Sequence, residues 1–99
     1  MKLLLITAVE EFGKEVKNIL KHSGVKSFSY QSVKGCKNNG DERENWFAKD
    51  HLSVDSLLFT VFMEDEFADE IYKSVEDFNS KQETFSHIHI ATLPLEKSI

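Results

Sequence analysis

The side chains in this sequence best suited to chemistry are one cysteine and a set of histidines. Cys36 and His51 lie near the two ends of a long polar segment, and His87 and His89 alternate close to the C-terminus. Thiolate and imidazole ligands suit zinc or copper, and a site shared between subunits can gather three or four of them. The spacing matches no standard zinc motif. The alternative is therefore that Cys36 is a small buried residue and that the histidines are polar positions on a sheet.

The polar segment, residues 34–52, is the second candidate for function, because it separates two stretches that are typical of β-strands. Connections this long are uncommon in compact domains and are commonly functional. Binding residues also concentrate on loops held by a rigid scaffold. Trp46 and Phe47 are candidate interface anchors, and Arg43 supplies a directional contact to a carboxylate. We expect these three residues to bind a partner protein, and the alternative is that both rings fold back onto the protein.

Motifs that carry a catalytic mechanism are absent from the sequence. It contains no Walker loop, no HExxH and no GxGxxG, and no serine lies in a nucleophile elbow. Cys36 lacks the sequence context of a cysteine enzyme. The acidic residues of the stretch 64–70 precede an apolar helical stripe, where they favour the helix dipole and form a solvated face. We therefore expect a protein that is not an enzyme.

Composition narrows the class of protein further. The chain has 99 residues, of which 40% are hydrophobic and 29% are charged, which is typical of one ordinary globular domain spanning residues 1–99. A formal net charge of −5 argues against nucleic acid as a partner. No apolar run approaches the length needed to cross a bilayer, so no membrane insertion is expected. A single cysteine fits the reducing cytoplasm, which is the expected location.

Hydrophobic periodicity defines six elements. Phe12, Val16 and Leu20 form one stripe of a helix that ends near Gly24, and Phe67, Ile71 and Val75 form another. The predicted helices span residues 10–22 and 64–79, and the predicted strands span residues 3–8, 26–34, 53–63 and 85–91.

The order of these elements, β-α-β-β-α-β, predicts a ferredoxin-like α+β fold in which one antiparallel sheet carries two helices on one face. The first and third strands are apolar at both parities, which indicates that both faces of the sheet are covered. Two helices cover one face only. We therefore expect a homo-oligomer that packs through the other face.

Four stretches of the sequence resemble the PII signalling proteins and their PII-like relatives. The first is the first strand (residues 2–6), and the second is the second strand with its Gly-Val entry and Val-Lys-Gly exit (residues 24–35). The third is the acidic start of the second helix (residues 64–71), and the fourth is the last strand with the segment that follows it (residues 88–99). The resemblance implies a homotrimer with a regulatory role and no catalysis. It also implies that residues 34–52 form a flexible T-loop that docks on a target protein such as a membrane transporter or an enzyme.

The family's adenine nucleotide site is matched only in part. Gly35, Lys37 and Asn39 occupy the base of the T-loop, where the resemblance implies ligand contacts, and His87 falls near the family's phosphate-contacting lysine. The connector at residues 79–86 contains no glycine, so it lacks the backbone freedom that lets N–H groups wrap phosphates. Adenine nucleotide binding of the family type is therefore not expected.

Two other functions fit the same predicted fold. One is a CutA-like trimer that binds divalent metal through the cysteine and histidines and acts in cation tolerance. The other is a small dimeric ferredoxin-like enzyme, which would need a buried polar constellation that the sequence does not show.

Overall fold

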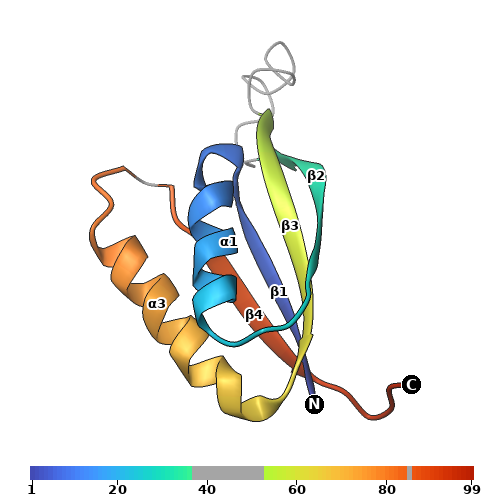
Figure 1. The fold of residues 1–99 in the computed structure, drawn as a ribbon. Coiled ribbons are helices and arrows are strands. Elements are labelled where there is room, and N and C mark those ends of the chain that lie inside the picture. Colours follow the sequence, from blue (N-terminus) through green and yellow to red (C-terminus); the bar gives the residue numbers. More distant parts are fainter. Residues whose placement is uncertain (37–52, 85) are drawn as a thin grey trace.

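The computed structural model describes residues 1–36, 53–84 and 86–99. Within these ranges the strands form one antiparallel sheet in the order β2-β3-β1-β4. Both helices lie on the same face of this sheet (Figure 1). The strands are β1 (Lys2–Val9), β2 (Ser29–Cys36), β3 (Ser53–Met63) and β4 (His89–Pro94). The predicted ferredoxin-like α+β fold is confirmed, with β1 and β3 inside the sheet as expected.

Each helix begins with a short 3₁₀ turn that carries acidic residues. Turn η1 (Glu10–Phe12) leads into α1 (Gly13–His22), and η3 (Asp65–Phe67) leads into α3 (Ala68–Ser80). Acidic side chains at this end stabilise a helix through its dipole. Gly24, with φ of +92°, follows the end of α1, where the helix was predicted to stop. In the described ranges, no helix is both long enough and apolar enough to serve as a membrane span.

The core lies between the helices and the sheet. Alternate residues of β1 and β3 point into it, and Leu4, Ile6 and Phe59 are fully buried there. Leu20 of α1 and Ile71 of α3 cover them from the other side and are also fully buried. Every second residue of the two strands and one face of each helix therefore pack together in a single apolar layer.

The N-terminal boundary of the second strand differs from the prediction. Strand β2 begins at Ser29 rather than at residue 26, and it continues through Cys36. Gly35 pairs with Val54 and Cys36 with Ser53, so the first three residues of the predicted loop at 34–52 belong to the sheet. Most of β2 is exposed because it pairs on one side only, and its polar residues therefore suit an edge strand.

The last strand lies further along the chain than predicted. Residues 85–91 were expected, whereas β4 begins at His89. The side chain of Asn79 accepts a hydrogen bond from the backbone N–H of Ile88 at 2.8 Å and donates one to its carbonyl at 2.9 Å. Both backbone groups of Ile88 are therefore engaged by α3 before pairing with β1 starts. Pro94, expected to lie beyond the strand, is its last residue, which an edge strand tolerates.

The face of the sheet opposite the helices is apolar. The strand register places Leu3 between Phe62 on one side and Leu93 on the other. Phe62 is 58% exposed and Leu93 is 44% exposed, whereas Leu5 and Leu58 on the same face are half-buried. We call this the open face; its central residues are Leu3, Leu5, Leu58, Thr60, Phe62, Ala91 and Leu93. Both described helices lie on the other side (Figure 1), so the predicted two-sided apolar character of β1 and β3 is confirmed.

Candidate functional site

The connection at residues 37–52 leaves and rejoins the sheet at one end of β2 and β3. The two strands stay paired until Cys36 opposes Ser53, so the connection is anchored at a fixed point. Two residues before this point, the ammonium group of Lys34 donates a hydrogen bond to Oδ1 of Asp55 on the opposite strand. This hydrogen bond, and next the negative charge of Asp55, raise the pKa of Lys34 above its ordinary value. The pair links two neighbouring positions of β2 and β3 just below the loop base.

Gly35 belongs to the predicted ligand site at the loop base and lies within the described residues, and Cys36, a predicted metal ligand, follows it. A Cβ atom at Gly35 would lie 3.0 Å from the hydroxyl of Ser56 and 3.5 Å from the carbonyl of Val54, so glycine permits close approach of β3. Cys36 is exposed, so the interpretation of this residue as a small buried side chain is wrong. Its thiol is accessible from solvent at the end of β2.

The two C-terminal histidines do not alternate along one strand as expected. His89 is exposed on the open face of β4, opposite Thr7, whereas His87 precedes the strand. Cys36 and His89 lie on the two edge strands of the sheet, with β3 and β1 between them. Three strand spacings separate them by roughly 14 Å. Within one subunit these two side chains therefore cannot bind the same metal ion.

The remaining predicted site residues fall outside the described ranges. In the parts of the chain that are described, no group of three or more cysteine, histidine or acidic side chains is placed to hold a metal ion. The predicted zinc or copper site, which includes His51 and draws on more than one subunit, stays a prediction. So do the predicted ligand and partner contacts of Lys37, Asn39, Arg43, Trp46 and Phe47.

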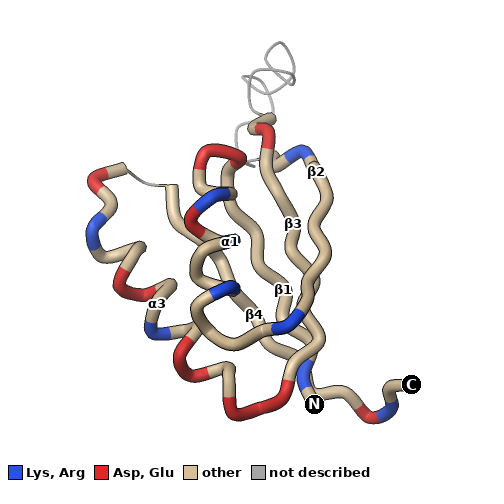
Figure 2. Tube along the Cα trace, in the orientation of Figure 1, with Lys and Arg blue, Asp and Glu red and all other residues tan. Residues whose placement is uncertain are grey.

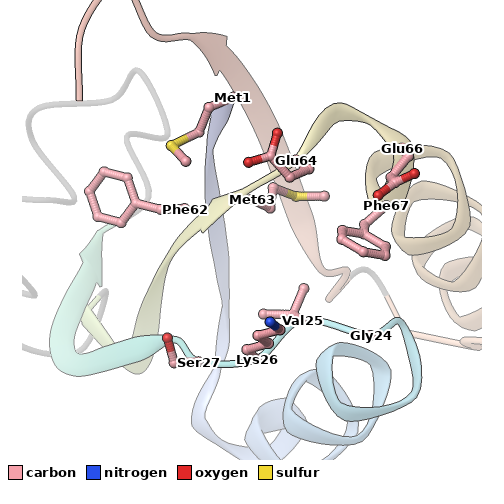
Figure 3. A pocket seen from close by; sticks show the side chains of 10 residues that line it. All are labelled: Met1, Gly24, Val25, Lys26, Ser27, Phe62, Met63, Glu64, Glu66 and Phe67. Atoms are coloured by element: carbon pink, nitrogen blue, oxygen red, sulfur yellow. The ribbon is translucent and has the colours of Figure 1, made fainter. Parts of the chain in front are cut away.

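A cavity that the sequence did not predict lies at the opposite end of the sheet (Figure 3). Its volume is about 370 Å³. Val25, Met63 and Phe67 contribute apolar walls, and Lys26 and Glu64 contribute charges of opposite sign. The walls come from the N-terminus, the α1–β2 turn and the junction of β3 with η3, so no local sequence pattern marks them. Because its charges are mixed, the cavity does not select a ligand of one sign.

Comparison with known proteins identifies the fold. No family model and no curated protein sequence matches the chain. A solved structure that resembles it is CPII, a nitrogen regulatory PII-like protein from Thiomonas intermedia K12, bound to ADP, AMP and bicarbonate. The two share 12% sequence identity with a TM-score of 0.65, over 99% of this chain and 94% of CPII. The chain has the fold of a PII-like protein.

The PII-like fold confirms, at the level of architecture, the resemblance drawn from the sequence. In this fold the predicted functional segment connects β2 to β3, and the described residues place its two anchors, Cys36 and Ser53, side by side. Sequence reasoning missed Asp55, which pairs with Lys34 across the strands. The polar neighbours of Asp55 gave no local signal for this pair, which follows only from the register of the hairpin.

Proposed function

We propose that this chain is a PII-like regulatory protein that assembles as a homotrimer, has no catalytic activity and binds a partner protein through residues 34–52. The observation that carries this proposal is the PII-like fold, which extends over 99% of the chain. In this proposal the sheet and helices form the scaffold, and the 37–52 connection recognises the partner.

The open face supports the homotrimer. Its row of Phe62, Leu3 and Leu93 lies side by side across three strands, and two of these residues are more than two-fifths exposed. A contiguous apolar surface of this kind marks an interface. Closed cyclic symmetry buries one such face from every copy around a common axis. The 37–52 connections of all copies then emerge at the same end of the assembly.

The loop base is the proposed site of the effector. CPII is bound to ADP, AMP and bicarbonate, and we propose that a small ligand binds here at the level of Gly35 and Cys36. The connector before β4 contains no glycine, so the ATP-binding mode of the family is not part of the proposal. A ligand that prefers one arrangement of the loop shifts the population toward that arrangement, and the partner then binds it more tightly.

Deletion of residues 41–49 tests partner binding through the loop. We expect the deleted protein to keep the oligomeric state and far-ultraviolet circular dichroism of the wild type, because β2 and β3 are paired outside the deletion. We also expect it to lose the proteins that the wild type captures and that mass spectrometry identifies. A triple variant, Arg43→Ala, Trp46→Ala and Phe47→Ala, separates loss of these side chains from loss of loop length. Capture of the same proteins by the deleted form would refute the loop as the binding element.

A thermal-shift screen tests the effector. AMP, ADP, ATP, bicarbonate, zinc and copper are added separately to the full chain, because a ligand that binds only the folded state raises Tm. A shift with AMP, ADP or bicarbonate supports a loop-base effector. A shift with zinc or copper alone, lost in the His87→Ala, His89→Ala double variant, instead supports a metal-binding trimer.

A further inference from the structure

A basic groove lies between α1 and β2, on the helix side of the sheet. Its volume is about 630 Å³, and Leu57 forms part of its floor. Three lysines of α1 line it, at positions i, i+3 and i+7 of one helix face, and the basic positions along α1 are visible in Figure 2. The three lysines are Lys14, Lys17 and Lys21, and the other lining residues are Glu10, Gly13, Asn18, Tyr30 and Ser32. We call this the α1–β2 groove.

Among the described residues, the three lysines of the groove form no salt bridge. The salt bridges among the described residues are Met1 with Asp65 and Lys34 with Asp55, so none of the three groove lysines has an acidic partner there. Lys17 instead donates a hydrogen bond to the hydroxyl of Tyr30 at 3.1 Å and lies 4.3 Å from the centre of its ring. In a chain of net charge −5, this is a local reversal of sign.

Helix stability does not explain the position of Lys14. It is the second residue of α1, where the positive end of the helix dipole disfavours a cation. Lys21 lies in the last turn, where the dipole favours it. The feature common to both residues is the groove that they line. An anion in the groove would interact favourably with both.

The spacing of the donors indicates the class of anion. A rise of 1.5 Å per residue spreads Lys14 to Lys21 over about 10 Å along the helix axis. The hydroxyl groups of Tyr30 and Ser32 offer uncharged donors on the facing strand. We propose that the α1–β2 groove binds a chain of linked phosphates, inorganic or attached to a larger molecule. This site does not depend on the proposed trimer interface, because it lies on the other side of the sheet from the open face.

Calorimetric titration of the full chain with inorganic tripolyphosphate at low salt tests the proposal. We expect the triple variant K14Q, K17Q, K21Q to bind tripolyphosphate about 30-fold more weakly. Each exposed pair of lysine and phosphate contributes only modestly to the binding free energy, and the three contributions add. The matched control K73Q, K81Q, K97Q removes the same charge from exposed lysines outside the groove and should change affinity less than about threefold. Orthophosphate should bind more weakly than tripolyphosphate because it cannot reach all three lysines.

A gain-of-binding variant keeps the test independent of folding defects. Glu10 lines the groove and repels an anion, so Glu10→Gln should raise affinity for tripolyphosphate by about threefold. Titration of the wild type with tripolyphosphate attached to a nucleoside shows whether an organic group adds affinity in the groove. The proposal is overturned if the wild type does not bind tripolyphosphate, if both lysine triples lose affinity equally, or if Glu10→Gln weakens binding.

Discussion

Replacing Phe62 by threonine should weaken the assembly without unfolding the subunit. Phe62 is 58% exposed on the open face, so more than half of its side chain remains to be buried by association. Full burial of a phenylalanine contributes about 1.5–3 kcal/mol, and the uncovered part therefore contributes roughly 1–2 kcal/mol per protomer. Three copies bring the loss to roughly 3–6 kcal/mol, and the association constant falls by a factor of about 10² to 10⁴. Threonine preserves strand propensity, so the fold is retained.

Sedimentation velocity over a series of protein concentrations measures this effect. The wild type should sediment as a trimer, and Phe62→Thr should dissociate at concentrations where the wild type stays assembled. Phe62→Leu is the matched control, because it keeps an apolar side chain at the same position and should sediment like the wild type. If Phe62→Thr assembles as tightly as the wild type, or if the wild type itself is a monomer, the reasoning from the open face is refuted.

Three further predictions concern the subunit itself. Asn79→Ala leaves both backbone groups of Ile88 without their partner and should lower the free energy of unfolding in urea by about 2 kcal/mol. Gly24→Ala places a Cβ atom 3.3 Å from the Phe67 ring at φ +92°, and calorimetry should show destabilisation on the order of 1–3 kcal/mol; an unchanged Tm would contradict the strain. The hydrogen bond to Asp55 raises the pKa of Lys34. The contribution of this pair to the free energy of unfolding is therefore complete at neutral pH and is lost as the pH rises through the raised pKa. Urea titrations should therefore show that the difference in free energy of unfolding between the wild type and Lys34→Met is constant from roughly pH 6 to pH 9. This difference should shrink only at strongly alkaline pH.

The order and type of the elements could be predicted because their hydrophobic periods are strong. The stripe that contains Val16 and Leu20 follows the helical period, and β3 contains a nearly continuous apolar run of strand length. The boundaries of β2 and β4 depend on interactions between distant residues. Asn79 delays the start of β4 by engaging Ile88, and the polar residues near Gly35 suggested a loop although they form an edge strand.

The candidate sites were less predictable than the fold. The lysines of α1 were visible in the sequence at helical spacing, but the groove also needs Tyr30 and Ser32 from a strand whose register the sequence does not specify. Asp55 was part of a predicted strand, and its pairing with Lys34 likewise follows from the register. Pairs between distant segments depend on tertiary packing, which local patterns do not encode.

Both chain termini emerge at the end of the sheet away from Cys36 and Ser53 (Figure 1), and the N–H of Leu95 donates a hydrogen bond to the carbonyl of Met1 at 3.3 Å. An affinity tag or fluorescent protein fused at Met1 or Ile99 therefore starts far from the strand ends that carry the 37–52 connection. The protein can therefore be immobilised through either terminus at one end of the sheet. A foreign peptide can then be grafted between Cys36 and Ser53 at the opposite end.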